Sequence, residues 1–326
     1  MEGNTTVNSR TPIKCIVKLG GAAVTFKNEL ESINSHNLYV FSSQLRESMM
    51  GTSQTPEKAF SLDWSKNSAN AGSPCDVAAV ESNPLLDYTS SGVVIVHGAG
   101  SFGHFQASAS GVHKGRLNQP LVKAGLVATR ISVTTLNLQI VRALAQEGIP
   151  SIGLSPFSCG WSSAKTNTDL GDSSVVRKAL EAGLVPVLHG DAMIDDSQVC
   201  SILSGDTIIR HLARHLNPQF VVFLTDVLGV YDRPPSDPNA QLLREIVVTK
   251  EGSWSLAGAG VETSTADHDT TGGMATKIAE AAAIAKFGIP VFIAKAGSDH
   301  SFAALNGQLL NSIPHDWLGT VVRLQD

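Results

Sequence analysis

Residues 93–105, VVIVHGAGSFGHF, form an apolar run that breaks into glycines spaced Gly98-x-Gly100-x-x-Gly103. This is the spacing of a dinucleotide-binding fingerprint, which also needs an acidic residue about twenty positions further on to bind the ribose. Residues 105–146 contain no Asp or Glu. Dinucleotide binding is therefore disfavoured, and because the sequence has no GxxxxGK(S/T) motif, a P-loop is excluded as well.

The glycines still match the physical requirements of an anion site. A parallel strand delivers them to its carboxyl end, where backbone N–H groups can point at a phosphate and a following helix adds its dipole. A tight strand–helix turn would need the same glycines for backbone freedom alone. Both interpretations stay open for this stretch taken by itself.

The rest of the chain alternates short apolar runs with helical patterns. Near-continuous apolar runs are typical of strands buried on both faces. The expected strands are 14–20, 92–98, 184–190, 220–226, 289–295 and 317–324, and the expected helices are 121–147, 172–182, 205–216 and 273–287. This alternation predicts an α/β fold with a mainly parallel central sheet covered on both faces.

Two stretches lack this pattern. Residues 48–91 are rich in Ser, Asn, Pro and Gly without sustained periodicity, and residues 251–271 are also irregular. The first predicts a long surface loop or a partly disordered insertion between two strands.

The bulk composition narrows the class of protein. A chain of 326 residues with 42% hydrophobic content can bury one large core or two lobes, and its net charge of −5 makes nucleic acid an unexpected partner. The four cysteines form no CxxC pair, which favours reduced thiols over disulfides or a zinc site. The polar N-terminus resembles no signal peptide, and the absence of an 18-residue apolar run predicts no membrane span. We therefore expect a soluble cytoplasmic enzyme.

Four further stretches place glycines or polar residues at the end of an expected strand or the start of an expected helix. They are Lys18-Leu19-Gly20-Gly21-Ala22 with Lys27 beyond it, Leu203-Ser204-Gly205-Asp206, residues 223–231 (FLTDVLGVY), and Thr270-Thr271-Gly272-Gly273-Met274 with Lys277. No single stretch is specific, but the ordered set predicts one crevice for a polyphosphate.

In this order the stretches resemble the amino acid kinase superfamily, and GAGSFGH, ending in His104, is most similar to its isopentenyl phosphate kinase branch. The resemblance runs from Ile13 to the last expected strand, apart from 48–91, which looks like the insertion of longer eukaryotic forms. It implies an open αβα sandwich, a homodimer, and ATP-dependent phosphorylation of isopentenyl phosphate, with dimethylallyl phosphate as a second acceptor, in isoprenoid biosynthesis. It also implies one domain over 12–326, with an acceptor-binding lobe over about 12–200 and a nucleotide-binding lobe over about 201–326.

The resemblance assigns a role to each motif. Lys18 would contact the transferred phosphate and Asp206 would orient that lysine, while His104, at the end of the glycine loop, would bind the acceptor's phosphate with Gly100, Gly103 and Gly205. The nucleotide phosphates would lie against Gly20, Gly21, Lys27, Gly273 and Lys277, and the nucleoside against Thr225, Asp226, Gly229 and Tyr231. Many relatives carry serine where this chain has Ala22, so only a backbone role is left there.

Each of these residues also has an ordinary structural interpretation. The lysines would be solvated surface residues, Asp206 a helix cap, His104 a structural histidine, and 225–231 a simple turn. Apolar residues of the expected helix 121–147 could line a prenyl pocket, although most of them are expected in the core. These residues are Leu126, Val127, Ile131, Val133 and Leu136.

The chemistry explains why no general base is evident. A phosphate monoester has a second pKa near 6, so its attacking oxygen is already ionised at neutral pH. The catalytic problem is then one of positioning and electrostatics, which lysines, a histidine and backbone amides can meet. No carboxylate cluster suggests a metal site built by the protein, so Mg²⁺ is expected on the ATP oxygens. An amino-acid or nucleoside-monophosphate acceptor, or a non-catalytic nucleotide-binding regulator, remain the alternatives.

Overall fold

The structure is a computed structural model that describes residues 12–50, 61–63, 83, 92–162, 170–195, 199–250, 254–256 and 273–325. Most of the predicted insertion at 48–91 and of the irregular stretch at 251–271 lies outside these residues. The first three residues of the predicted insertion belong to a helix, α2 (Ser35–Met50), and residues 254–256 form a short strand.

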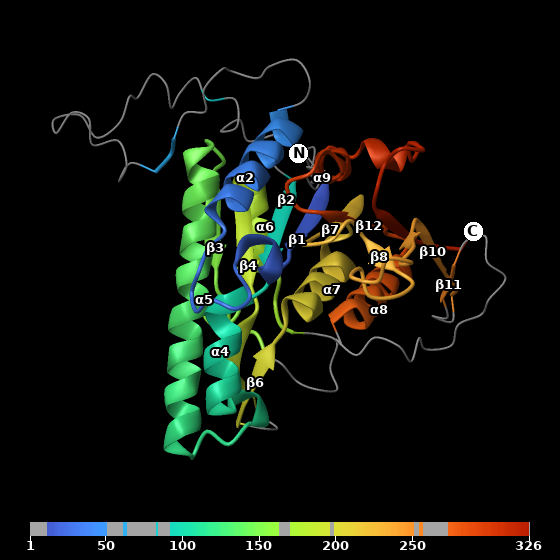
Figure 1. Ribbon diagram of the computed structural model, residues 1–326. Coiled ribbons are helices and arrows are strands. Elements are labelled where there is room, and N and C mark those ends of the chain that lie inside the picture. The colour runs from blue at the N-terminus through green and yellow to red at the C-terminus, as the bar shows by residue number, and fades with distance from the viewer. Residues whose placement is uncertain are drawn as a thin grey trace, which may run out of the picture.

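Within the described ranges, nine strands form one twisted sheet in the order β11-β10-β13-β12-β7-β1-β2-β4-β3 (Figure 1). Their bounds are β1 (Cys15–Leu19), β2 (Val93–His97), β3 (Ser151–Leu154), β4 (Val185–His189), β7 (Phe220–Thr225), β10 (Glu245–Val248), β11 (Trp254–Leu256), β12 (Val291–Lys295) and β13 (Thr320–Leu324). From β3 to β12 all neighbours are parallel, whereas β12 with β13 and β10 with β11 pair antiparallel. The predicted mainly parallel sheet is therefore confirmed.

Helices cover both faces of this sheet (Figure 1). One face carries α6 (Ser174–Glu181), α7 (Gly205–Leu216) and α8 (Gly273–Ala285). The other face carries α1 (Gly21–Val24), α2, α4 (Gly100–Ser110), α5 (Pro120–Gln146) and α9 (Asp299–Leu305). The helices predicted at 121–147, 172–182, 205–216 and 273–287 are thus confirmed as α5, α6, α7 and α8. The architecture is the expected αβα sandwich.

Alternation along β1 decides which side chain reaches which face. Cys15, Val17 and Leu19 are buried in the core under α2 and α5, whereas Ile16 is buried in the core under α7. Because strand residues alternate between faces, Lys18 shares the α7 side with Ile16. A lysine is thereby placed between β1 and α7, at the carboxyl end of the sheet.

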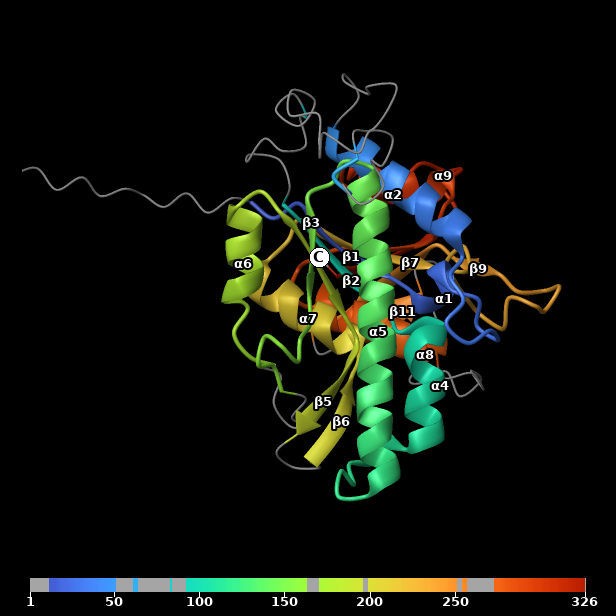
Figure 2. The ribbon, with the colours of Figure 1, turned by 90° about the vertical axis from the view of Figure 1, so that its left-hand side faces the viewer.

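Short elements complete the fold. A hairpin of β5 (Asp191–Asp195) and β6 (Val199–Leu203) extends from the sheet beside the lower half of α5 (Figure 2). The other short elements are a small ribbon of β8 (Val230–Tyr231) and β9 (Leu242–Leu243) and the 3₁₀ turns η3 (Val112–Lys114) and η4 (Gln308–Leu310). Helix α5 has 27 residues and contains an 18-residue window that is long and apolar enough to cross a bilayer, and 44% of this window is buried in the protein.

The expectation that His104 lies at the end of a glycine loop is wrong. The chain turns directly from β2 into α4, which begins at Gly100, so His104 lies in a helix. Gly100 makes this turn possible because its φ of 52° lies in the left-handed region that favours glycine.

Candidate active site

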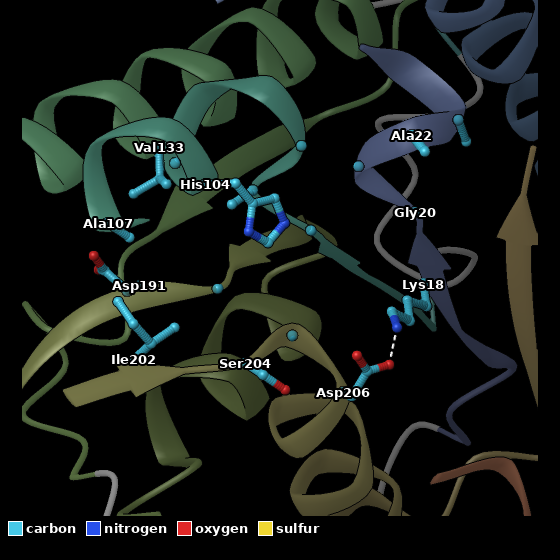
Figure 3. A pocket seen from close by; sticks show the side chains of 18 of the residues that line it. Lys18, Gly20, Ala22, His104, Ala107, Val133, Asp191, Ile202, Ser204 and Asp206 are labelled. Atoms are coloured by element: carbon cyan, nitrogen blue, oxygen red, sulfur yellow. Dashed lines mark ion pairs between the residues drawn. The ribbon is translucent and has the colours of Figure 1, made fainter. Parts of the chain in front are cut away.

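A cleft with a volume of about 500 Å³ opens at the carboxyl ends of β1, β2 and β7 (Figure 3). The strand β1 has β2 on one side and β7 on the other, so the chain winds away from it in both directions. Open α/β sheets bind ligands at such switch points, outside the carboxyl ends of the strands. The strand ends, the start of α7 and the helices α4, α5 and α8 all contribute residues to the walls.

Lys18 and Asp206 form an ion pair at one end of the cleft (Figure 3). The Lys18 side chain is only 8% exposed, and its Nζ lies 5.1 Å from the ring centre of Phe223. Asp206 is in the first turn of α7, but the cap of that helix is Ser204, whose hydroxyl accepts a hydrogen bond from the Thr207 N–H at 3.2 Å. Asp206 is therefore not a helix cap, and its carboxylate is available to hold the lysine.

Burial and the positive charge of Lys277 lower the pKa of Lys18 from its ordinary value to about 7, while Glu280 acts in the opposite direction. Desolvation disfavours the ammonium form of a buried lysine, and an adjacent carboxylate favours it. The contact with Asp206 therefore counteracts this desolvation and favours a charged donor in a largely dry position.

Lys27 and Asp226 form a second ion pair at the mouth of the cleft, with Nζ and Oδ2 2.8 Å apart. Burial acts to raise the pKa of Asp226, but the hydrogen bond and charge of Lys27, with a smaller contribution from Lys277, leave it below its ordinary value. Lys27 is 65% exposed. Lys277 also lines the cleft, from the second turn of α8. Lysines from the loop after α1, from β1 and from α8 thus converge on one space.

Glycines let the ends of β1 and β2 approach each other beneath these lysines. A Cβ at Gly21 would lie 2.3 Å from the backbone nitrogen of Gly100, and one at Gly98 would lie 2.9 Å from that of Gly21. A Cβ at Gly20 would come 2.8 Å from the Leu224 carbonyl oxygen. Side chains at these positions would collide with the backbone of the neighbouring strand ends, so glycine allows this close packing, and these residues line the cleft. Such a cradle beside converging lysines fits a polyphosphate.

His104 lies on α4, between the lysine end of the cleft and the opposite end (Figure 3). Its side chain is exposed and lines the cleft, and its role in binding the acceptor stays a prediction. Gly100 and Gly103 line the same wall. Gly103 has a further reason to be glycine, since a Cβ there would lie 2.7 Å from Cγ1 of Val133 on α5.

The end of the cleft away from Lys18 is mainly apolar. Ala107, Val133 and Ile202 project into it from α4, α5 and β6 (Figure 3). Of the apolar residues considered on 121–147, Val133 therefore lines the cleft, whereas Leu136 is fully buried in the core. Val127 and Ile131 are exposed on another face of α5 and border a separate shallow depression.

Some residues of the predicted nucleoside loop lie apart from this cleft. Thr225 and Asp226 line it, but Gly229 and Tyr231 are not among the described residues that do. Gly229 packs against β13, where a Cβ would meet Oγ1 of Thr320 at 2.5 Å. Gly205 lines the cleft at the start of α7, and Gly273 is the first residue of α8.

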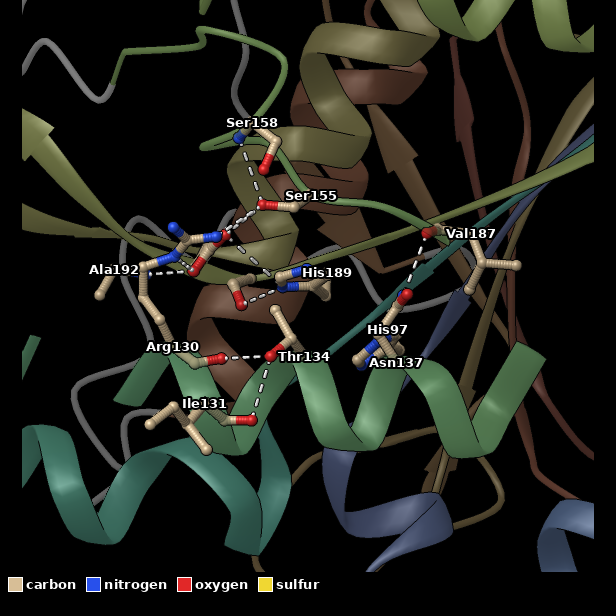
Figure 4. Close-up of polar contacts among 12 residues, drawn as sticks. His97, Arg130, Ile131, Thr134, Asn137, Ser155, Ser158, Val187, His189 and Ala192 are labelled. Atoms are coloured by element: carbon tan, nitrogen blue, oxygen red, sulfur yellow. Dashed lines mark hydrogen bonds and ion pairs between the residues drawn. The ribbon is translucent and has the colours of Figure 1, made fainter. Parts of the chain in front are cut away.

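Sequence reasoning missed a buried polar network beside the cleft (Figure 4). Asp191, fully buried, accepts hydrogen bonds from Arg130 Nε at 3.2 Å and from the Ser155 hydroxyl at 3.0 Å. The Arg130 guanidinium also lies 3.9 Å from the centre of the Phe157 ring. This network ties α5 to the start of the β5–β6 hairpin and so fixes one wall of the cleft.

Two histidines end adjacent strands in the same region. His97 on β2 and His189 on β4 are fully buried, with ring centres 5.6 Å apart. His97 Nδ1 donates to the Gly98 carbonyl at 2.9 Å, and its Nε2 accepts from the Asn137 amide at 3.1 Å. Figure 4 shows the rings of the two histidines with Asn137 beside His97. The repeated His-Gly at the ends of two predicted strands is the sequence signal that could have identified this pair.

In the described ranges no group of three or more His, Cys, Asp or Glu side chains is arranged to hold a metal ion. The donors facing the lysine end of the cleft are ammonium groups and backbone N–H groups, which bind anionic oxygens rather than cations. The residues present therefore fit a nucleoside triphosphate, with any magnesium ion bound to its phosphate oxygens.

Comparison with known proteins agrees with this geometry. Residues 80–295 match the model of the amino acid kinase family. The chain is 57% identical to an isopentenyl phosphate kinase of Arabidopsis thaliana over 99% of both chains, and 35% identical to one of Methanothermobacter thermautotrophicus over 61% of this chain and 74% of that protein. A crystal structure of isopentenyl phosphate kinase superposes with a TM-score of 0.65 at 26% identity, covering 94% of this chain and 99% of the other. The chain therefore belongs to the amino acid kinase family and, within it, to the isopentenyl phosphate kinases.

Proposed function

We propose that this protein transfers the γ-phosphoryl group of ATP to isopentenyl phosphate, giving isopentenyl diphosphate and ADP. The observation that carries the proposal is the layout of the cleft. Lys18, Lys27 and Lys277 line one end, His104 lies beyond them, and the far end is formed by apolar side chains such as Val133. An anionic group next to a short apolar tail is the acceptor that matches this order.

The chain's residues supply positioning and charge. His104 and the start of α4 bind the acceptor's phosphate, whose oxygen attacks the γ-phosphorus while the bond from that phosphorus to the ADP oxygen breaks. Lys18, held by Asp206, lies where the negative charge of the transferred group concentrates. Bringing two anions together is the main barrier, and pre-aligned cations lower it without a general base. Bound ATP supplies the phosphoryl donor, and Mg²⁺ on its oxygens neutralises part of its charge.

The proposal also covers the second acceptor, the assembly and the location of the protein. Dimethylallyl phosphate has the same charge and tail length, so we include it as a second acceptor. The exposed apolar side chains Leu121, Val127, Ile131 and Leu138 on α5 support a homodimer. The thiol side chains of Cys15, Cys159 and Cys200 are consistent with the cytoplasm, and the net charge of −5 is consistent with a small-molecule substrate rather than nucleic acid.

A coupled assay of ADP release tests the function directly. The acceptors are isopentenyl phosphate, dimethylallyl phosphate, a longer prenyl phosphate, glutamate, aspartate and UMP, each with ATP and with or without Mg²⁺. Isopentenyl phosphate should give the highest kcat/KM, and only with Mg²⁺ present. Faster phosphorylation of an amino acid or of UMP would overturn the proposal, and no phosphorylation of any acceptor would favour a regulatory nucleotide-binding protein.

A further inference from the structure

A second pair of opposite charges lies one helical turn beyond the Lys18–Asp206 pair. Arg210 follows Asp206 by four positions on α7, and Glu280 follows Lys277 by three positions on α8. Residues at these spacings share a helix face. The two helices pack against each other, and Arg210 Nη1 lies 3.4 Å from Glu280 Oε2 across their contact. On α7 the acidic residue lies nearer the start of the helix and the basic residue one turn later. On α8 the order is reversed, with the lysine first and the glutamate one turn later.

Glu280 is poorly placed for an ordinary surface ion pair. Its side chain is only 14% exposed, and burial raises its pKa, against the opposing effects of Arg210 and Lys18. A buried carboxylate costs free energy unless nearby cations compensate for lost hydration. The cations that act on it come from both sides, Arg210 from α7 and Lys18 from β1.

We propose that Glu280 is a positioning residue for phosphoryl transfer: paired with Arg210, it is an internal counter-charge that favours the protonated form of Lys18 beside Lys277 at one end of the cleft. Two adjacent ammonium groups repel each other, and Lys18 is already desolvated. Glu280 offsets this repulsion before any phosphate arrives, without occupying the space that the phosphates need. The inference rests on the proposed function only for its kinetic consequence.

The groups around Lys18 and along the cleft come from several elements of the fold. Phe223 of β7 contributes an uncharged ring. The titratable and charged groups are Asp206 on α7, Lys277 and Glu280 on α8, His104 on α4, Asp191 at the start of β5, and Lys27 and Asp226 at the mouth. Of these, Lys277 lowers the pKa of Lys18 and Glu280 raises it. Removing the charge of Glu280 should therefore deprotonate Lys18 at lower pH.

The test measures the pKa of Lys18 directly, so that it does not depend on the acceptor. The full-length protein is labelled with acetic anhydride between pH 5.5 and 10, and acetylation of Lys18 is quantified by mass spectrometry. In Glu280→Gln the midpoint should fall by about 0.5 unit or more, equivalent to a change of about threefold in the ratio of neutral to charged lysine. Glu280→Asp keeps the carboxylate but moves it away from Lys18, because the side chain is one methylene shorter. This variant should give a smaller shift of the midpoint in the same direction. It replaces Glu280→Gln if that variant does not fold.

Glu147→Gln is the matched control. Glu147 caps the carboxyl end of α5, is 12% exposed and pairs with Arg46 of α2 at 3.2 Å, so its loss should lower stability similarly without moving the Lys18 midpoint. Steady-state kinetics complete the test. The alkaline limb of kcat/KM for isopentenyl phosphate should move to lower pH in Glu280→Gln only, with little change in the acceptor's KM at pH 6. An unchanged midpoint in both Glu280 variants would overturn the inference, whereas a shifted midpoint in a protein that phosphorylates no prenyl phosphate would overturn only the proposed function.

Discussion

Acidification should destabilise this protein through His97. Burial, reinforced by the neighbouring His189, lowers the pKa of His97 to about 3. The neutral ring satisfies both of its nitrogens, because Nδ1 donates to Gly98 O and Nε2 accepts from Asn137. A proton on Nε2 would face the Asn137 amide, which is itself a donor. The folded state therefore binds no proton here as the pH falls toward 4.

The sign and size of the effect follow from this difference. In the unfolded chain the imidazole has a pKa of about 6.5 and gains a proton below it, whereas in the folded protein it stays neutral until about pH 3. The stabilisation is therefore complete above pH 6.5 and is lost as the pH falls. Between pH 7 and pH 4.5 this loss lowers the free energy of unfolding by about 2.6 kcal/mol.

Urea denaturation at pH 7, 6, 5 and 4.5 measures this loss. His97→Asn keeps a donor for Gly98 O but cannot titrate, so its stability should fall by about 2.6 kcal/mol less than that of the wild type over the same range. The variant should also be about 1–3 kcal/mol less stable at pH 7, because Asn137 loses its acceptor. His113→Asn, at an exposed position on η3, serves as the control and should keep the wild-type pH dependence. Parallel pH dependences in wild type and His97→Asn would refute the reasoning.

Three further predictions concern the cleft. His104→Ala should lower kcat/KM for isopentenyl phosphate by about one to two decades and leave the KM for ATP unchanged, because a charge-assisted contact is worth about 1.5–3 kcal/mol. His104→Asn should recover part of the loss. Near-wild-type kinetics in the alanine variant would show that His104 is a structural residue. Lys18→Ala should lower kcat about a hundredfold or more with little change in either KM, and a loss confined to KM would contradict its role in the transition state. Gly21→Ala should cost about 1–3 kcal/mol of stability in thermal or urea denaturation, since its Cβ would lie 2.3 Å from the Gly100 nitrogen, and an unchanged stability would show that the strand ends can separate.

The parts of the fold that local sequence predicts well are those whose pattern is set by burial. The strands β1, β2, β4, β7 and β12 are near-continuous apolar runs because both of their faces are covered. Helix α4 was missed because GSFGHFQASAS is rich in glycine and serine, which are poor helix formers. Its helical state depends on packing against α5, at a contact that Gly103 permits.

The residues of the candidate site also differ in how well the sequence predicted them. Lys18, Asp206 and His104 were predicted because they lie in short motifs that, in this order, resemble those of the amino acid kinase superfamily. Arg130 and Asp191 were not, because their pairing joins residues that are far apart in the chain and no local pattern marks either one. Gly229 and Tyr231 were grouped with the cleft by their place in a motif; they are not among the described residues that line it, and their contact with the nucleoside stays a prediction. The division into an acceptor lobe and a nucleotide lobe stays a prediction.

The position of β1 also has a consequence for how the chain reaches its folded state. Among the described strands β1 comes first in the chain and is synthesised before both of its neighbours, Val93–His97 on one side and Phe220–Thr225 on the other, with Cys15 paired to Val93 and to Phe220. Until the second neighbour has been synthesised, one edge of β1 is an unpaired apolar template for other chains. Pairings so distant in sequence are slow to form. Nascent chains that stop short of residue 225 should therefore be the ones that aggregate or require a chaperone.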